Sequence, residues 1–201
     1  MVIFRSKRYF GTILMMNINS FLSCNYPVGL VLLSSATAPK PFERSVIIVI
    51  QHDSRIGTMG LRIDKPLRLT LDDFDEKRWG AFDSIPVYYG GPMQQNQIIV
   101  TSFERDKRSH NLCWRLSFTP EQAMHLLRSS QTSTFKAYCG YVGWRPGQLV
   151  EEIKQQLWLP VALVPQKLFS LAATHLWETL VFQNYPSELP ANYLPPKPQL
   201  N

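Results

Sequence analysis

Five consecutive residues, Trp144-Arg145-Pro146-Gly147-Gln148, could together recognise an anion. They follow an apolar run typical of a strand and precede a segment with the apolar period of a helix. The free backbone amides at a helix start suit a phosphate or a carboxylate, Arg145 would add a forked donor, and Trp144 could stack on a planar ligand. In the structural alternative Trp144 belongs to the core, Pro146 opens the helix and Gln148 caps it locally. The residue types favour this alternative.

A histidine beside a carboxylate, His52-Asp53, could act as an acid or a base because imidazole titrates near neutral pH. Adjacent residues of a strand point to opposite faces, however, so the two side chains need not meet. If the pair caps the turn before Gly57, its role is structural, and we favour that role.

The glycine pair Gly90-Gly91 could present backbone amides to an anion, although Pro92 after it removes one donor. A glycine pair more often marks a positive φ or a close approach of two backbones. The structural interpretation is again the stronger one.

Other kinds of site lack their residue patterns. The sequence contains no glycine-rich loop ending in Lys-Ser or Lys-Thr, and no Gly-x-Ser-x-Gly nucleophile turn. Its three cysteines, Cys24, Cys113 and Cys139, form no Cys-x-x-Cys pair and lie outside metal-ligand register with the histidines. We therefore expect no metal, no cofactor and buried thiols in a reducing compartment. These observations weigh against an enzyme.

The charge of the chain is basic but dispersed. Its 201 residues carry a net charge of +6, which makes nucleic acid or an anionic membrane conceivable partners. The two most regular predicted helices contain few cations, namely Arg128 in one and Lys154 between glutamates in the other, so direct DNA binding is disfavoured. No segment reaches the roughly 18 apolar residues of a membrane span.

The elements that must position these residues follow in a mixed order. We expect strands at 29–34, 45–50, 59–63, 87–89, 97–101, 112–118, 134–142 and 161–164, and helices at 119–129, 147–157 and 168–182. A loop with a short helix is expected over 67–79. Because strict alternation of strands and helices is absent, an α+β fold is favoured. We expect a disordered or mis-annotated leader over residues 1–25, one domain over 26–184, and a proline-rich tail over 185–201.

Four motifs occur in the order found in the YqgE/AlgH family of bacterial proteins, and the chain resembles that family from about Gly29 to Phe182. The motifs are Gly29-Leu30-Val31-Leu32-Leu33 with Pro41-Phe42-Glu43-Arg44-Ser45-Val46; His52-Asp53 with Gly57-Thr58-Met59-Gly60-Leu61; Val87-Tyr88-Tyr89-Gly90-Gly91-Pro92; and Gly140-Tyr141-Val142-Gly143-Trp144 with Pro146-Gly147-Gln148-Leu149, Glu152-Ile153 and Trp158-Leu159. The resemblance implies a single α+β domain with a bifurcated, mostly antiparallel sheet folded as a pseudo-barrel with flanking helices, in the cytoplasm. One branch of the family is labelled transcriptional regulator, and no reaction is firmly attached to the family.

Three positions depart from the family pattern. Asp64 stands where relatives usually place asparagine, Arg145 occupies a position that is often small, and Thr101 replaces a histidine that many members have. A polar site shared by the whole family is therefore in doubt for this chain.

These observations lead to one functional expectation and one alternative. We expect a regulatory or binding domain of this family, acting on an unidentified protein or a small anionic ligand. The candidate ligand residues are His52, Gly90, Gly91, Trp144, Arg145, Gly147 and Gln148. The alternative is an enzyme of unknown reaction that uses the same corner with His52 as its base.

Overall fold

The computed structural model describes residues 2–5, 28–82, 84–105, 112–129, 134–161, 168 and 173–188. The strands of this part of the chain are β1 (Val2–Arg5), β2 (Val31–Ser34), β3 (Val46–Asp53), β4 (Gly57–Arg62), β5 (Pro66–Thr70), β6 (Pro86–Tyr89), β7 (Met93–Arg105), β8 (Leu112–Ser117), β9 (Thr134–Trp144) and β10 (Trp158–Val161). The helices are α2 (Leu71–Phe74), α3 (Glu76–Trp79), α4 (Pro120–Ser129), α5 (Gln148–Lys154) and α7 (Leu176–Asn184), with short 3-10 turns at Gly80–Phe82, Ala173–His175 and Pro186–Glu188.

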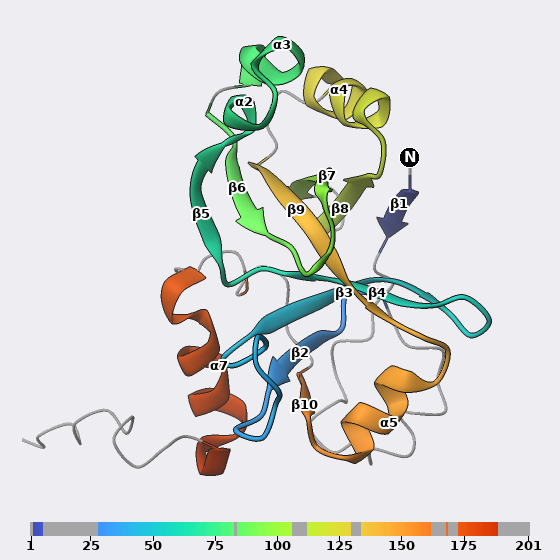
Figure 1. The fold of residues 1–201 in the computed structure, drawn as a ribbon, viewed down its shortest axis with the longest axis vertical. Coiled ribbons are helices and arrows are strands. Elements are labelled where there is room, and N and C mark those ends of the chain that lie inside the picture. Colours follow the sequence, from blue (N-terminus) through green and yellow to red (C-terminus); the bar gives the residue numbers. More distant parts are fainter. Residues whose placement is uncertain are drawn as a thin grey trace, which may run out of the picture.

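One mixed sheet organises the fold, and β9 is its central strand. The strand order is β1-β8-β7-β9-β4-β3-β2-β10, and β5 and β6 form a branch that joins β9. β9 pairs parallel with β6 and antiparallel with β7, and its last residues, Val142 to Trp144, pair antiparallel with β4. The sheet therefore divides along β9 and curls into a half-barrel (Figure 1). The predicted α+β class and the bifurcated, mostly antiparallel sheet with flanking helices are confirmed.

Alternate residues of β3 place two helices on opposite faces of the sheet. Val46, Ile48 and Ile50 belong to an apolar cluster that includes residues of α7. Ile47 and Val49 belong to a second cluster, which includes residues of α5. Both faces of β3 are thus covered, which explains its continuous apolar run.

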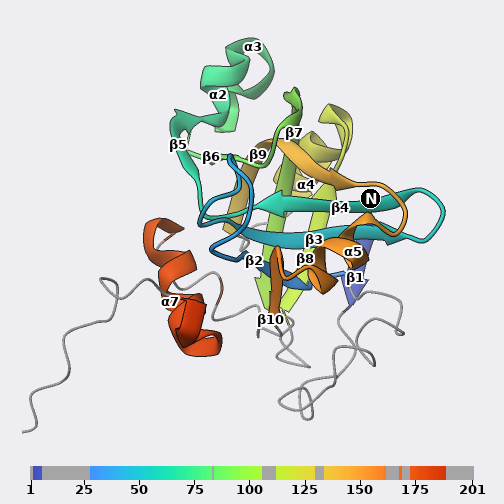
Figure 2. The same cartoon turned by 60° about the horizontal axis from the view of Figure 1, so that its bottom comes forward.

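A third apolar cluster lies at the other end of the molecule, where α2, α3 and α4 meet the upper strands. The fully buried side chains there include Leu71, Val87, Val100 and Ala137. Both views show α2 and α3 as an arm that continues from β5 and stands at the same end as α4 (Figures 1 and 2).

The start of α4 confirms the predicted cap. Thr119 Oγ1 accepts a hydrogen bond from the backbone amide of Gln122 at 3.3 Å. The Gln122 side chain returns one residue further than in a standard capping box, because its Oε1 accepts from the amide of Phe118 at 3.1 Å. Two amides that helix formation would leave without partners are satisfied in this way.

Several elements differ from the expectations. Within the described residues, the helix expected at 168–182 is a 3-10 turn at Ala173–His175 followed by α7, which ends at Asn184. β5 was expected to be a loop, but Pro66–Thr70 forms a strand that pairs with β6 and is mostly exposed, so its sequence lacks a buried apolar face. The final strand is Trp158–Val161 and not 161–164, of which 162–164 lie outside the described residues. Helix α5 ends at Lys154 because the chain turns before this strand, with Gln156 at a left-handed φ of 58°.

The ends of the chain are described in part. Val2–Arg5 of the expected leader pairs antiparallel with β8. Tyr185 donates a hydrogen bond from its hydroxyl to the carbonyl of Pro160 at 2.7 Å, which holds the end of α7 against β10. Residues 6–27 and 189–201 lie outside the described residues. Within the described part, no helix is long and apolar enough to cross a membrane.

Candidate functional site

Three neighbouring strands place His52, Thr58 and Trp144 in one cross-strand row. His52 Nδ1 lies 2.7 Å from the hydroxyl oxygen of Thr58, which is itself buried. The carboxylate of Asp53 is used in the hairpin turn, where it accepts from the amides of Arg55 at 2.7 Å and Ile56 at 3.0 Å. These two hydrogen bonds lower the pKa of Asp53. Asp53 therefore organises the turn, as the structural interpretation of the pair expected.

Trp144 is held in the core by Glu152. Its indole Nε1 donates to Glu152 Oε2 at 2.8 Å, and Trp158 Nε1 donates to the same oxygen at 2.7 Å. The two indole rings meet edge to face at 5.9 Å. Trp144 is 5% exposed, so its ring faces are occupied by protein.

Gln148 completes this arrangement. Its Nε2 donates to Glu152 Oε1 at 2.8 Å, and its Oε1 accepts from the backbone amide of Arg145 at 3.0 Å. Gly147, at a left-handed φ of 77°, is the N-cap of α5, which has only seven residues. Both polar atoms of the Gln148 side chain thus have protein partners, whereas the Arg145 side chain is exposed.

Glu152→Ala is expected to lower the free energy of unfolding by about 3 kcal/mol, because two buried indole N–H groups and the Gln148 amide lose their acceptor. Glu152→Gln keeps one oxygen for the indoles but turns an amide nitrogen toward Gln148, so about 1 kcal/mol is expected. Urea denaturation of the three proteins measures both values. A cost below about 1 kcal/mol for the alanine variant would mean that water replaces the carboxylate.

Gly90 and Gly91 pack against residues of β9 that precede Trp144, the last residue of that strand. Gly90 donates from its amide to the carbonyl of Cys139 at 2.8 Å, and its own carbonyl accepts from the amide of Arg62 at 2.9 Å. Cys139 is five residues before Trp144, or roughly 16 Å along an extended strand. The structure therefore brings His52 and Trp144 into one cross-strand row. It places Gly90 at Cys139 and Gly91 at Tyr141 and Val142, where two backbones cross.

A shallow groove opens beside Trp144, between the β3–β4 hairpin and the start of β7. We call it the hairpin groove, and it encloses about 270 Å³. Its lining includes Gln51, Ile56, Met59, Met93, Tyr141 and Arg145. Ile56 is 76% exposed and Met93 is 43% exposed. Among the described residues around the groove, Gln51 lines it and His52 does not.

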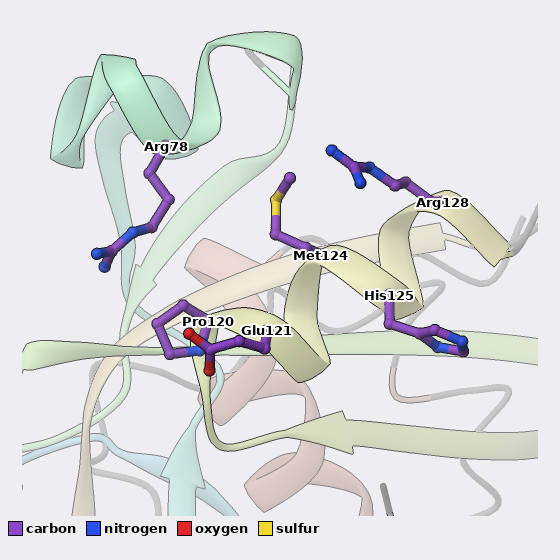
Figure 3. Close-up of a pocket in the computed structure, with 6 residues that line it drawn as sticks. All are labelled: Arg78, Pro120, Glu121, Met124, His125 and Arg128. Carbon is purple, nitrogen blue, oxygen red and sulfur yellow. The ribbon is translucent and has the colours of Figure 1, made fainter.

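Sequence reasoning missed a second hollow, between α3 and α4. We call it the interhelix hollow, and its outer half encloses about 560 Å³ (Figure 3). The outer half is lined by Arg78, Pro120, Glu121, Met124, His125 and Arg128. Its inner half, of about 570 Å³, shares Arg78 and Pro120 and reaches the amide side chains at the start of β7. The available signal was the run Gln94-Gln95-Asn96-Gln97, which has no place in an apolar core.

Asp64 and Thr101, which we expected to depart from the family pattern, and the thiol of Cys139 have different environments. Asp64 forms a buried ion pair with Arg62 at 2.8 Å. Thr101 is buried, and its hydroxyl donates to the carbonyl of Lys136 at 3.2 Å. Cys139 is a buried free thiol whose pKa is raised by burial. Among the residues that the structure describes, no three His, Cys, Asp or Glu side chains gather as metal ligands would.

Comparison with known proteins gives a consistent result. A family model described as AlgH-like matches residues 30–185. A UPF0301 protein of Aliivibrio fischeri (strain MJ11) is 30% identical over 149 residues, covering 68% of this chain and 79% of the relative. A UPF0301 protein of Streptomyces coelicolor is 27% identical over 183 residues, covering 86% and 93%.

Two solved structures resemble the fold. The solution structure of the AlgH protein from Pseudomonas aeruginosa has a TM-score of 0.58 at 23% identity, covering 77% of this chain and 86% of that one. The crystal structure of a protein from Corynebacterium diphtheriae has a TM-score of 0.59 at 20% identity, covering 83% and 90%. At these identities the similarity concerns the fold alone.

Proposed function

This chain belongs to the AlgH-like family, and on that premise we propose that it is a regulatory binding domain that docks an acidic segment of a partner protein in the hairpin groove. The exposure of Ile56 is the observation that carries the proposal. A large apolar side chain that is 76% exposed at a hairpin tip gains about 1.5–3 kcal/mol when a partner covers it. Met93, on the other side of the groove, offers a second, adaptable apolar contact.

The hairpin tip is ordered before any partner arrives. The Asp53 carboxylate accepts from the amides of Arg55 and Ile56 and so fixes the turn that presents Ile56. Binding to a pre-formed turn loses less conformational entropy than binding to a mobile one. This supports a role in recognition for a side chain that contributes little to the core.

The charges around the hairpin groove favour an acidic partner. Arg145 lines the groove and is exposed, and Arg55 is exposed next to Ile56. The one carboxylate of the hairpin, Asp53, is already engaged with backbone amides. An apolar segment flanked by aspartate or glutamate would therefore meet apolar lining and two cations.

Regulation through a protein partner fits the helices better than direct contact with DNA. Arg128 is the cation of α4, and Lys154 of α5 pairs with Glu151 at 3.0 Å. Neither helix offers the several cations that phosphate contacts need. We place the protein in the cytoplasm, where a buried free thiol such as Cys139 stays reduced.

Selection of short displayed peptides against the full chain tests this proposal. We expect the enriched peptides to combine Leu, Ile or Phe with flanking acids. Ile56→Ser and Arg145→Glu should each weaken their binding at least about tenfold, equivalent to roughly 1.4 kcal/mol. Binding constants come from fluorescence anisotropy of the labelled peptides.

Two controls separate the groove from general surface stickiness. Phe182→Ser removes another exposed apolar side chain, 46% exposed on α7, and should leave peptide affinity unchanged. Peptides with lysine in place of the acids should bind Arg145→Glu better than the wild type. Enriched peptides that bind Ile56→Ser as tightly as the wild type would refute the assignment of the groove.

A further inference from the structure

The interhelix hollow has two halves of different chemistry. The outer half, between α3 and α4, carries the guanidinium groups, and the inner half carries amide side chains. Arg78 and Pro120 line both halves, so the two halves adjoin each other at these residues. Volumes of about 560 and 570 Å³ are within the range of small-molecule sites. We infer that this hollow binds a nucleoside phosphate, with the phosphate between Arg78 and Arg128 and the base in the inner half.

The outer half supplies forked donors from two separate elements. Arg78 extends from α3 on one side of Met124, and Arg128 extends from α4 toward Met124 on the other side, whereas His125 points away from Arg78 (Figure 3). One guanidinium group can donate two parallel hydrogen bonds to two oxygens of a phosphate. An arginine on each helix therefore suits a phosphate that is bound between the two helices. Met124 is half-buried between the two arginines and offers an apolar surface to a ribose.

Two carboxylates, Asp75 and Glu121, lie near the outer half and reduce its attraction for a phosphate group. Arg78 Nε lies 3.7 Å from Asp75 Oδ2, but both side chains are about half exposed, so this pair is weak and a phosphate can displace it. Glu121 is also exposed in the outer half, and the hydrogen bond from its own amide, the Thr119 hydroxyl and nearby Arg78 lower its pKa. Because this carboxylate opposes an anion, inorganic phosphate alone should bind poorly. The inner half must contribute to affinity.

The inner half is shaped by an irregularity of β7. The pairing of β7 with β9 shifts register between Met93 and Ile98, and Gln94 has a left-handed φ of 47°. Bulges re-aim side chains, and a non-glycine residue at positive φ often marks a functional position. The shift leaves Gln94, Asn96 and Gln97 lining the hollow.

Amide side chains are suited to the edge of a base. An amide offers a donor and an acceptor side by side, the combination that pairs with a purine edge in nucleic-acid complexes. Gln97 Nε2 donates to the carbonyl of Phe118 at 2.9 Å, which fixes that side chain. Phe74, half-buried, lines the same half and supplies an aromatic surface. This site is separate from the hairpin groove and does not depend on the proposed function.

Titration calorimetry with the full chain tests the inference with three probes: nucleoside monophosphates (AMP, GMP, CMP and UMP), the matching nucleosides, and inorganic phosphate. We expect one monophosphate to bind with a dissociation constant of about 1 mM or tighter, and its nucleoside and inorganic phosphate each to bind at least about tenfold more weakly. Inorganic phosphate binding as tightly as every nucleotide would reduce the site to an anion patch and overturn the inference. No saturable binding of any monophosphate in that range would overturn it too.

Substitutions in each half test which part of the ligand that half binds. Arg128→Ala should weaken the monophosphate at least about fivefold and leave the nucleoside unchanged, whereas Asn96→Ala should weaken both. Glu121→Gln should tighten the monophosphate about threefold because it removes a like charge. Arg68→Ala, an exposed arginine on β5, is the matched control and should change nothing. A monophosphate that is insensitive to both Arg128→Ala and Asn96→Ala binds elsewhere.

Gln94→Gly guards against a loss of binding that comes from misfolding. Glycine accepts the φ of 47° without strain, so this variant should keep the melting temperature of the wild type or raise it. It nevertheless removes one amide from the inner half, and monophosphate affinity should fall at least about threefold. Unchanged affinity in a well-folded Gln94→Gly protein would show that the Gln94 amide, which the register shift of β7 places in the hollow, does not bind the ligand.

Discussion

Gly91→Ala is expected to lower the free energy of unfolding by about 4 kcal/mol or more, which is enough to unfold many domains of this size. A Cβ at Gly91 would lie 2.2 Å from the carbonyl carbon of Tyr141 and 2.6 Å from the amide nitrogen of Val142. Both atoms are backbone atoms of β9, so no side-chain rotation relieves the clash. Gly91 also has a φ of +157°, at which a side chain adds strain.

The loss of stability expected for Gly91→Ala is large because the backbone at Gly91 crosses β9, the central strand of the sheet. β9 carries the pairings of both halves of the half-barrel, with β6 and β7 on one side of the division and β4 on the other. A displacement of β9 at Tyr141 would therefore disturb both groups of strands. Interiors are close-packed and yield little, so the clash cannot be spread over many small shifts.

Gly147→Ala is the matched control for this prediction. Gly147 has a φ of +77°, but a Cβ there would meet no heavy atom within 4 Å. Only backbone strain remains, and about 1 kcal/mol is expected. Urea denaturation, with limited proteolysis for a protein that fails to fold, compares the two variants. Equal costs would show that the crossing relaxes, and a binding role for Gly90 and Gly91 would regain weight.

The sequence predicted those parts of the fold whose signals are local. The Thr119-Pro120 start of α4 was expected because a capping side chain and a proline act within one helical turn. Strand β3 was expected because the β-branched residues of its run from Val46 to Ile50 favour a strand. The exposed strand β5 escaped prediction because a strand without a buried face has no alternation to detect.

The sites were less predictable because tertiary contacts define them. The sequence favoured the core over ligand stacking for Trp144, but it did not show which residues hold the ring. The structure shows that Glu152 accepts from the indole N–H and that the Trp158 ring packs against it. The hairpin groove joins side chains from four strands, and no spacing along the chain reveals that Ile56 and Met93 line the same groove. The interhelix hollow depends on a register shift in β7, which periodicity cannot show.

Asp64→Ala is expected to lower the free energy of unfolding by about 3–5 kcal/mol, the cost of removing one partner from a buried ion pair. Asp64 Oδ2 accepts from Arg62 Nη2 at 2.8 Å, and Asp64 Oδ1 accepts from the amide of Val46 at 2.8 Å. The two side chains are only 10% and 7% exposed. After the substitution, Arg62 keeps the carbonyl of Pro41 at 3.1 Å as an acceptor, and the Val46 amide loses its partner.

Asp64→Asn separates the contribution of the carboxylate charge to the free energy of unfolding from that of its hydrogen bonds. Asparagine keeps an oxygen for Val46 but turns its amide nitrogen toward Arg62 Nη2, so an intermediate cost of about 2 kcal/mol is expected.

The exposed ion pair between Glu151 and Lys154 is the control. Its distance of 3.0 Å is similar to that of the Arg62–Asp64 pair, but its side chains are 62% and 53% exposed. Glu151→Ala should therefore cost about 0.5 kcal/mol or less. If Asp64→Ala proved as mild as Glu151→Ala, Arg62 would have to reach water by a rearrangement of the segment that carries Pro41. Thermal and urea unfolding of the four proteins give the comparison, because burial is the main variable that distinguishes the two pairs.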